Sequence, residues 1–288
     1  MDLKQLRKEI DGIDDQLVQL FAQRMAVSAR IADYKKEHDL PIFVPSREQE
    51  KLLDVAQKAG SDLQVYTKVL YDLLFELSRG YQSKRNAART PLFNRISQAI
   101  AETEKCLPKG IAVACPGEED PHSAAICQKL FGASSMLPFK HQDGILSAVS
   151  QGLCRYGLLP LDGNCKELYD MIGQKQLFIV RALRLNDQRQ YICVSKRLEI
   201  FPGTDRTSLR LALSDRPGAL YKVLARLYTL GINVARLESK PLLGANFTGM
   251  FYFDLETSVY SEEFVLLMCE LEDLCTEFTY LGSYCEVV

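Results

Sequence analysis

The sequence has 288 residues, of which 47% are hydrophobic and 25% are charged, as in ordinary globular proteins. This length indicates two or three domains, at roughly 100–200 residues per domain. With 35 Lys and Arg residues against 37 Asp and Glu residues, the formal net charge is −2. That balance excludes an overall positive field that would hold the chain on nucleic acid or on an anionic membrane. A small anion would have to be bound by a few locally placed basic residues.

The cysteine and histidine content excludes the common zinc motifs. The nine cysteines form no C-x-x-C pair, and the sequence has three histidines. The N-terminus leads directly into an amphipathic pattern rather than a signal peptide, and no apolar run reaches the roughly 18 residues of a membrane span. These features predict a cytoplasmic protein with free thiols, no metal and no cofactor.

The N-terminal region begins with apolar residues at alternating three- and four-residue steps, which predicts one long helix with a heptad seam. The seam consists of Leu3, Leu6, Ile10, Ile13, Leu17, Leu20, Val27, Ile31 and Tyr34. A helix of roughly 50 Å cannot bury this seam inside one small domain, so we expect it to pack against a second copy of the chain. The pattern also leaves open a coiled-coil scaffold without activity.

Basic residues on this helix predict an anion site. Arg24 occupies a seam position, where a guanidinium without a partner would be costly. Lys35 follows eleven residues later, about three helical turns, and therefore shares its face. Arg7 is rotated away from this face, so we expect it to address a different pocket, such as that of a partner chain.

Two further helices are predicted in this region, and both carry polar residues at informative positions. The second begins with Ser46 as its expected N-cap. The third covers residues 63–84, and its apolar stripe becomes polar toward the end, which indicates a ligand-filled or solvent-exposed end of a core. The polar residues of interest on these two helices are Arg47, Glu48, Ser78 and Gln82.

Residues 1–86 resemble the all-helical class of chorismate mutase. The resemblance rests on L-R-x-x-I at Leu6 and Arg7, on P-I-x-x-x-x-R-E ending at Arg47 and Glu48, and on Arg24, Lys35, Ser78 and Gln82. It implies an all-α domain in which three helices per chain form an intertwined dimer, or part of a higher homo-oligomer, with two active sites. It also implies that Arg7 reaches into the partner's site.

The implied reaction, chorismate to prephenate, is a pericyclic rearrangement without a covalent intermediate. The enzyme must therefore hold a flexible dianion in its compact conformer. Arginine suits this task because its guanidinium pairs with a carboxylate through two hydrogen bonds. By resemblance, Arg7 of one chain and Arg24 of the other bind the two carboxylates, and Arg47 and Ser78 assist.

The site must also stabilise the negative charge that grows on the ether oxygen as its bond to carbon breaks. By resemblance, Lys35 and Gln82 donate to this oxygen, and Glu48 accepts from the ring hydroxyl. The chain departs from the family at Val44, where an acidic residue is frequent. We expect this change to weaken binding rather than abolish catalysis.

The middle region, residues 104–200, alternates predicted strands and helices and resembles prephenate dehydratase in an eroded form. Its first motif, at residues 115–125, has lost the hydroxyl residues of the family, and its second lies at residues 157–164. The family's T-R-F segment is replaced by Arg189-Gln190-Tyr191, and residues 164–186 are too few for a second lobe. We therefore expect a small α/β remnant without dehydratase activity, in which His122 and His141 are ordinary surface or satisfied residues.

The C-terminal region, residues 205–288, predicts the order βαββαβ of a ferredoxin-like α+β fold. It resembles the ACT domain of dehydratases through Gly218-Ala219-Leu220 and Glu238-Ser239-Lys240-Pro241. This resemblance implies that both segments bind phenylalanine at a dimer interface. Lys240 replaces the usual arginine, which keeps the charge but loses the planar fork. The alternative is that the glycine segment is only a helix-initiating turn.

Together these patterns predict a multidomain chorismate mutase of aromatic amino-acid biosynthesis, in which a C-terminal sensor regulates the reaction. Chorismate and prephenate are the expected ligands, and phenylalanine is the expected effector. One alternative is a working bifunctional chorismate mutase/prephenate dehydratase. Another is a non-catalytic regulatory subunit of an aromatic-pathway enzyme, which the intact set of polar residues in 1–86 disfavours.

Overall fold

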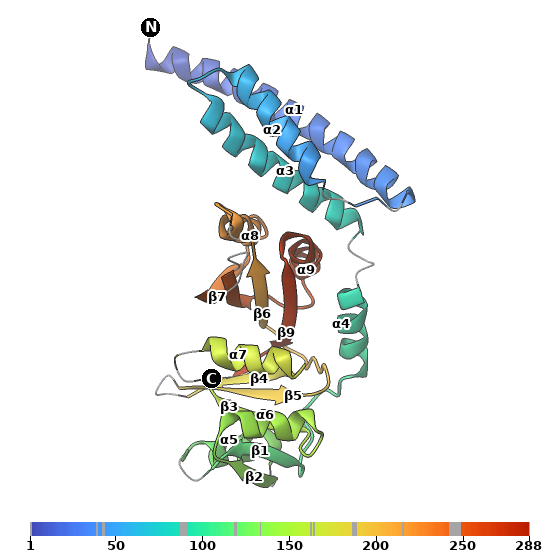
Figure 1. The fold of residues 1–288 in the computed structure, drawn as a ribbon, viewed down its shortest axis with the longest axis vertical. Helices are drawn as coiled ribbons and strands as arrows, with labels where there is room; N and C mark the ends of the chain where they lie inside the picture. Colours follow the sequence, from blue (N-terminus) through green and yellow to red (C-terminus); the bar gives the residue numbers. More distant parts are fainter. Residues whose placement is uncertain are drawn as a thin grey trace. The chain divides into compact units, whose positions relative to one another are not determined.

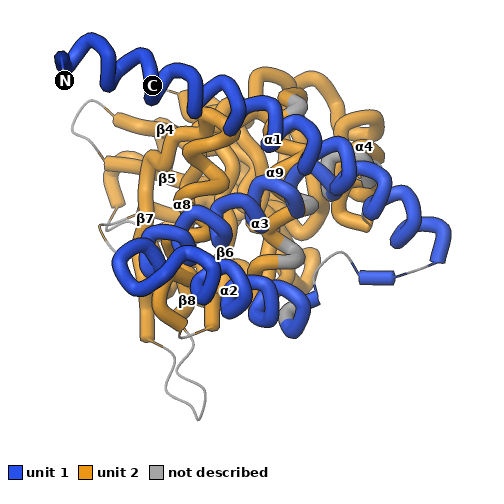
Figure 2. The backbone as a smooth tube through the Cα atoms, turned by 90° about the horizontal axis from the view of Figure 1, so that it is seen from above, with its two compact units in different colours: residues 1–89 blue, residues 90–288 orange. Residues whose placement is uncertain are grey.

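A computed structural model of the chain describes residues 2–38, 40–41, 44–86, 91–117, 120–132, 134–161, 163, 165–185, 189–214, 216–241 and 249–287. The chain divides into two compact units, Met1–Arg89 and Thr90–Val288, which Figure 2 shows in different colours. Each unit is described by itself. None of the helices in the described ranges is both long enough and apolar enough to cross a membrane.

Unit 1 consists of three helices, α1 (Leu3–Glu37), α2 (Pro45–Ala59) and α3 (Gln64–Asn86). The long helix predicted from the seam is present: α1 has 35 residues and is about 50 Å long. Helix α2 begins at Pro45 with Val44 as N-cap, so the predicted cap at Ser46 is wrong. Proline suits the first helical position because its φ is already helical and that position needs no N–H.

The third helix, predicted to end at residue 84, is slightly longer in the structure. Helix α3 continues to Asn86, and α4 (Pro91–Glu102) begins after it. Residues 87–90 lie outside the described residues. Polarity alone did not indicate the end of α3, because a helix that projects beyond a core needs no apolar stripe.

Unit 1 buries little apolar surface within one chain. Among its described residues, the buried apolar side chains are those of Ala29, Ala32, Val55 and Ala56. The heptad seam of α1 remains accessible: Leu17 is 54% exposed and Ile13 is 56% exposed. Further large apolar side chains are exposed on α3.

Unit 2 contains a six-stranded sheet in the order β10-β4-β5-β3-β1-β2. Its strands are β1 (Ala112–Pro116), β2 (Ser135–Phe139), β3 (Tyr156–Pro160), β4 (Phe178–Arg184), β5 (Gln190–Ser195) and β10 (Glu286–Val287), and its helices are α5 (Ser123–Phe131), α6 (Gln142–Ser150) and α7 (Cys165–Gln174). Strands β1, β2 and β3 are parallel, whereas β5 is antiparallel to β3 and β4. The sequence analysis predicted neither β2 nor α7.

The second sheet of unit 2 has the order β7-β8-β6-β9. Its elements, in chain order, are β6 (Arg206–Leu213), α8 (Ala219–Thr229), β7 (Asn233–Pro241), β8 (Gly249–Glu256), α9 (Glu262–Leu274) and β9 (Glu277–Tyr284). The predicted order βαββαβ is therefore confirmed. Helices α8, α9 and α4 share one apolar core with this sheet.

Helix α7 lies between the two sheets of unit 2 (Figure 1). Its Leu168, Tyr169 and Ile172 are buried in one core with residues of both sheets. The backbones of β9 and β4 also meet closely. Gly282 has φ +139°, and a Cβ there would lie 2.2 Å from the carbonyl oxygen of Ile179. The two regions predicted as separate domains, 104–200 and 205–288, thus share a core and an inter-sheet contact.

Candidate functional site

A cavity of about 310 Å³ in unit 1 receives side chains from all three helices. It is lined by Arg24, Ser28, Ile31, Lys35, Val44, Arg47, Glu48, Lys51, Phe75, Ser78 and Gln82. Six of the residues that the sequence singled out therefore lie around one space, although they are spread over 59 positions of the chain. The seventh, Arg7, is exposed near the N-terminus of α1 and does not line this cavity.

Arg24 is held at the cavity by uncharged partners from α3. Its guanidinium donates to the carbonyl oxygen of Leu74 at 2.9 Å and to the hydroxyl of Ser78. It also lies over the ring of Phe75, 5.7 Å from the centroid. Partial burial lowers the pKa of Arg24, and the nearby Tyr71 and Glu48 oppose that shift. An incoming carboxylate would find this charge oriented in advance and without a carboxylate partner among the described residues.

Glu48 depends on a residue that the sequence analysis missed. The buried Arg79 forms ion pairs with Glu48 on α2 and with Glu76 on its own helix. The spacing of Glu76 and Arg79, three residues apart on one helix, was the available signal. Because Arg79 bridges α2 and α3, it fixes the side chain of Glu48 at the wall of the cavity.

Lys35 and Gln82 lie on opposite helices of the cavity, α1 and α3. Burial lowers the pKa of Lys35, and the charge of Glu48 partly offsets this effect. Gln82 is 7% exposed, and its Oε1 atom is buried without a hydrogen-bond partner in the described structure. A buried amide that lacks a partner is costly unless a ligand completes its hydrogen bonds.

Arg47 and Val44 lie at the rim of the cavity. The side chain of Arg47 is 71% exposed and pairs with Glu50 at 2.8 Å. This pairing accounts for an arginine in the first turn of a helix, where the macrodipole alone would disfavour it. Val44 presents an apolar side chain to the same space. Within the described ranges, no cluster of His, Cys, Asp or Glu could hold a metal ion.

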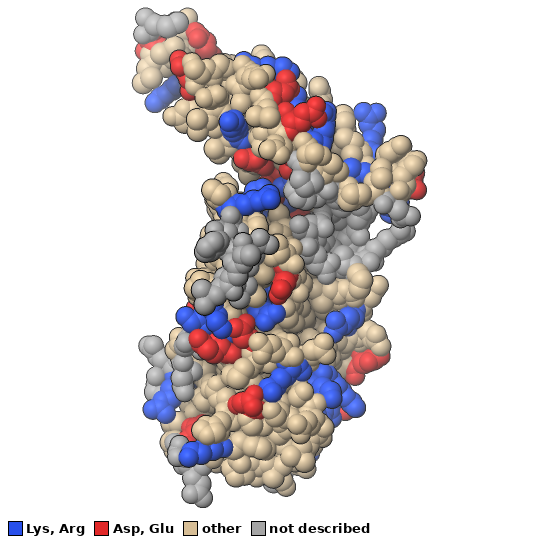
Figure 3. All heavy atoms as spheres, viewed as in Figure 1, with Lys and Arg blue, Asp and Glu red and all other residues tan. Residues whose placement is uncertain are grey.

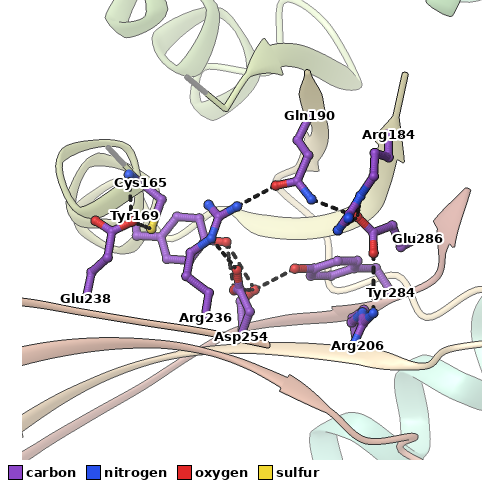
Figure 4. A network of polar contacts seen from close by, with 11 residues as sticks. Cys165, Tyr169, Arg184, Gln190, Arg206, Arg236, Glu238, Asp254, Tyr284 and Glu286 are labelled. Atoms are coloured by element: carbon purple, nitrogen blue, oxygen red, sulfur yellow. Dashed lines mark hydrogen bonds and ion pairs between the residues drawn. The ribbon is translucent and has the colours of Figure 1, made fainter. Parts of the chain in front are cut away.

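The positions that correspond to dehydratase motifs in unit 2 are occupied by internal contacts (Figure 4). Gln190 donates to Glu286 at 2.8 Å and accepts from Arg236. Tyr191 donates to Asp120 at 2.8 Å. The cavity beside Gln190 has a volume of about 50 Å³, which is room for a few water molecules but far below the roughly 300 Å³ of a typical ligand site.

The two histidines of this region lie at helix starts. His122 precedes α5, and its main-chain N–H donates to Asp120 at 3.1 Å. His141 is the N-cap residue of α6. Neither position adds an acid to the small cavity beside Gln190, because neither histidine lines it.

The first C-terminal motif lines a cavity of its own. Gly218, Ala219 and Leu220 border a space of about 310 Å³ together with Arg216, Tyr221 and Phe251. Gly218 has φ +85°, and an added Cβ would meet no described atom within 4 Å. The glycine is therefore favoured by its left-handed backbone.

The second C-terminal motif instead contacts α7. Lys240 donates to Asp170 at 2.9 Å, and Glu238 accepts from the thiol of Cys165 at 3.0 Å (Figure 4). Ser239 and Pro241 belong to the same strand, β7, with both side chains exposed. Among the described residues, none of the second motif lines the cavity that borders Gly218. The two motifs approach each other at the pairing of Pro241 with Gly249, because Gly249 borders the cavity of the first motif.

Comparison with known proteins identifies the three-helix region. Residues 6–83 match the family described as chorismate mutase type II. This match spans nearly all of helices α1, α2 and α3. The T-protein of Haemophilus influenzae is 42% identical over 72 residues, which cover 24% of this chain and 19% of that protein.

The similarity to one relative extends over the whole chain. The bifunctional chorismate mutase/prephenate dehydratase of Aquifex aeolicus is 23% identical over 374 positions, covering 98% of each chain. That alignment is longer than the 288 residues of this chain, so the relative contains segments without a counterpart here. The chain with a chorismate mutase domain is thus similar throughout to the bifunctional enzymes.

Solved structures resemble the remainder of the chain. Prephenate dehydratase from Arthrobacter aurescens, in complex with L-Phe, has a TM-score of 0.52 at 17% identity and covers 61% of this chain and 90% of its own. A structure described as GqqA, a novel type of quorum quenching acylase, has a TM-score of 0.53 at 26% identity and covers 60% and 94%. The dehydratase likeness shows a dehydratase-like α/β fold.

Proposed function

We propose that the protein is a chorismate mutase of aromatic amino-acid biosynthesis, active as a dimer through unit 1. The observation that carries this proposal is the single cavity that gathers Arg24, Lys35, Arg47, Glu48, Ser78 and Gln82 from three helices. The chorismate mutase domain and the similarity to bifunctional enzymes support the same pathway.

In the proposed mechanism the cavity selects and stabilises a conformation and exchanges no proton with the substrate. Arg24, oriented by Ser78 and Leu74, binds one carboxylate of the dianion. Lys35 and Gln82 donate to the ether oxygen, where negative charge develops as the carbon–oxygen bond breaks. Glu48, held by Arg79, accepts from the ring hydroxyl. In this role the amide nitrogen of Gln82 is the donor, whereas its buried Oε1 is an acceptor without a partner in the described structure.

The proposed dimer supplies what one chain lacks. The apolar seam of α1 is exposed in the single chain, and exposed apolar faces of this extent are typical of interfaces between subunits. Arg7 lies on the same helix but away from the cavity of its own chain. In a two-fold dimer it would complete the cavity of the partner and bind the second carboxylate.

The test is a chorismate-disappearance assay on the full chain, with the product identified by mass spectrometry after chromatography. We expect prephenate to accumulate in proportion to chorismate consumed. A protein that binds chorismate without turnover would instead support the non-catalytic regulatory subunit and overturn the proposal.

We further propose that the dehydratase activity is lost. The T-R-F residues are replaced, and Gln190 is engaged in contacts with Glu286 and Arg236. The adjoining space of about 50 Å³ is too small for an organic dianion. Purified protein given prephenate should therefore form no phenylpyruvate. Enzyme-dependent phenylpyruvate would establish the bifunctional alternative.

The C-terminal half of unit 2 is proposed to be an ACT-type sensor for an aromatic amino acid. The βαββαβ topology, the cavity beside Gly218 and the likeness to a dehydratase in complex with L-Phe support this role. Contacts of Glu238 and Lys240 with α7 would connect a ligand at this sheet to the middle region. A mutase rate and a Tm that both stay constant up to millimolar phenylalanine would contradict it.

The cellular compartment is proposed from the thiols. The eight cysteines that the structure describes are free, and five of them are buried. Free buried thiols persist in reducing compartments, which fits a cytoplasmic enzyme. Thiol counting on protein purified rapidly under alkylating conditions would test this: oxidised cysteines would argue against it.

A further inference from the structure

A second ligand-sized space in unit 2 belongs to neither the mutase cavity nor the sensor motifs. Its volume is about 790 Å³, and it is lined by Pro91, Leu92, Arg95, Ser150, Gly173, Lys175, Gln176, Leu177, Phe178, Lys196, Phe278, Thr279 and Tyr280. We call this space the α4 groove. Its volume falls within the range of 300–1,000 Å³ of small-molecule sites.

The walls of the α4 groove are apolar and aromatic, whereas its charged groups have one sign. Phe178, Phe278 and Tyr280 come from β4 and β9, next to the place where the two sheets meet. The charged side chains in the lining are Arg95, Lys175 and Lys196, and no described lining residue is acidic. Figure 3 shows basic side chains on the face that carries α4 and the neighbouring ends of α6 and α7.

The cations of the groove are not equally neutralised. Lys175 pairs with Asp143 at 3.1 Å and donates to Ser147. Arg95 lies over the ring of Phe178, 5.8 Å from its centroid. Within the described part of the chain, neither Arg95 nor Lys196 forms an ion pair with a carboxylate. Two positive charges are therefore available beside an aromatic wall.

Gln176 adds a polar group to the groove at a conformational cost. It has φ 55°, the positive φ of a non-glycine residue. Its N–H donates to the carbonyl of Gly173, and the N–H of Leu177 donates to that of Ile172. This is the helix-ending motif in which glycine is preferred at the left-handed position. The chain here carries an amide that lines the groove instead of the glycine that would stabilise the turn.

We propose that the α4 groove binds a small aromatic carboxylate that has no amino group. The ring would pack on Phe178 and Tyr280, and the carboxylate would be bound by Arg95 and Lys196, with the amide of Gln176 as a further donor. An amino acid fits less well, because its ammonium group would meet three cations and no acidic partner in the described lining. This inference is independent of the proposed mutase function.

The test is equilibrium dialysis of the full chain with phenylacetate, compared with phenylacetamide, phenylalanine and inorganic phosphate. We expect phenylacetate to bind, and the neutral amide, the amino acid and phosphate each to bind about three- to fivefold more weakly, since a partly exposed charge pair is worth up to about fivefold. Equal binding of phosphate would reduce the groove to a general anion patch and overturn the proposal. So would no binding of phenylacetate at millimolar concentration.

Variants locate the binding. Arg95→Gln and Lys196→Gln should each weaken phenylacetate binding about three- to fivefold, and the double variant should weaken it about ten- to twentyfold. Lys129→Gln, which removes an exposed charge on α5 outside the groove, should leave it unchanged. Lys35→Ala distinguishes binding in the unit 1 cavity from binding in the α4 groove. If phenylacetate binding is lost in Lys35→Ala and kept in the groove variants, it belongs to the unit 1 cavity, and the proposal is contradicted.

One variant distinguishes binding from folding. Gln176→Gly relieves the left-handed backbone and should raise the Tm by about 2 °C, while phenylacetate binding weakens. A loss of binding in a protein that has become more stable cannot be caused by unfolding. If Gln176→Gly raises the Tm and leaves binding unchanged, this amide has no part in the site.

Discussion

The two units of this protein differ in how much apolar surface they bury within one chain. In unit 2, helices cover both sheets, and large side chains such as Tyr169, Phe253 and Phe264 are at most 1% exposed. In unit 1, the buried apolar side chains of the described residues are two alanines on α1, and one valine and one alanine on α2, while the seam of α1 remains exposed. Unit 2 thus buries a large apolar core within one chain, whereas unit 1 leaves its seam exposed within one chain.

The same contrast extends to the polar residues. In unit 1, Gln82 lines the cavity and has a buried oxygen without a partner in the described structure, and Arg24 lines it with no described carboxylate as its partner. In unit 2, Gln190 is engaged by Glu286 and Arg236, whereas Asp120 accepts from Tyr191 through one oxygen and its other oxygen is buried without a partner in the described structure. Catalysis needs polar groups that are oriented and still available. By this criterion the cavity of unit 1 keeps an oriented polar group available, whereas Gln190 in unit 2 is already engaged.

The largest expected effect tests whether unit 1 is completed by a second copy. Arg7→Ala and Arg24→Ala should each lower mutase activity about a thousandfold or more. When the two variants are mixed and allowed to exchange subunits, half of the dimers are mixed, and each mixed dimer has one intact site. Activity should therefore recover to about a quarter of the wild-type value. If the mixture stays inactive, Arg7 does not act in the partner's site.

The next prediction concerns the transition state. Lys35→Ala should lower kcat about a hundredfold to a thousandfold, with little change in KM, because the lost contact forms mainly as the ether bond breaks. A raised KM with an intact kcat would assign Lys35 to ground-state binding. Because burial lowers the pKa of Lys35, kcat should also fall as the pH rises through that lowered pKa. Lys35→Arg, which stays protonated, should move this decline to higher pH.

The close contact between β4 and β9 can be tested by adding one methyl group at Gly282. Gly282→Ala places a methyl group on the carbonyl oxygen of Ile179 and should destabilise unit 2 by at least about 3 kcal/mol, measured by urea unfolding. The matched control is Gly12→Ala in α1, where a Cβ would meet no described atom within 4 Å. That variant should stabilise unit 1 by about 0.5–1 kcal/mol. If Gly282→Ala does not lower the free energy of unfolding, the β4–β9 contact is looser than described.

A smaller expected effect is that protein concentration changes the Tm of unit 1 and leaves the Tm of unit 2 unchanged. Thermal unfolding of the full chain should show one transition whose Tm rises by several degrees over a hundredfold increase in protein concentration, because association stabilises only the associated form. The transition of unit 2 should not move, since its core lies within one chain. Circular dichroism at 222 nm follows the helices of both units, so the dependence on protein concentration is what assigns a transition to unit 1. A concentration-independent helical transition would argue that the exposed seam of α1 stays uncovered in solution.

The sequence predicted the site of unit 1 better than the middle of unit 2, for a physical reason. Helical periodicity is local, so the seam, the break at Arg24 and the shared face of Lys35 could be recognised along one segment. Arg79 was missed because its ion pair with Glu48 forms only where α2 and α3 pack together. Pairing across helices cannot be read from spacing on one helix.

The missed elements of unit 2 had weak local signals. Strand β2 is an edge strand with mostly exposed residues and contains Pro138, so it lacks the apolar alternation of a half-buried strand. Helix α7 has only ten residues, and its apolar Leu168, Tyr169 and Ile172 are explained by the two sheets that enclose them. Both elements are specified by neighbours distant in sequence rather than by their own pattern.

The smallest expected effect concerns the one cavity residue that departs from the family. Val44 borders the cavity and is also the N-cap of α2, without a side-chain hydrogen bond to the helix. Val44→Asp should lower KM for chorismate a few-fold with kcat unchanged, if a carboxylate there accepts from a substrate hydroxyl. It should also stabilise α2 by about 1 kcal/mol, because aspartate is a good N-cap. Val44→Asn separates these effects, since it caps the helix about equally well without the added charge. If both variants raise the Tm and only the aspartate lowers KM, the apolar side chain at this position limits substrate affinity and leaves the chemical step to Arg24, Lys35 and Gln82.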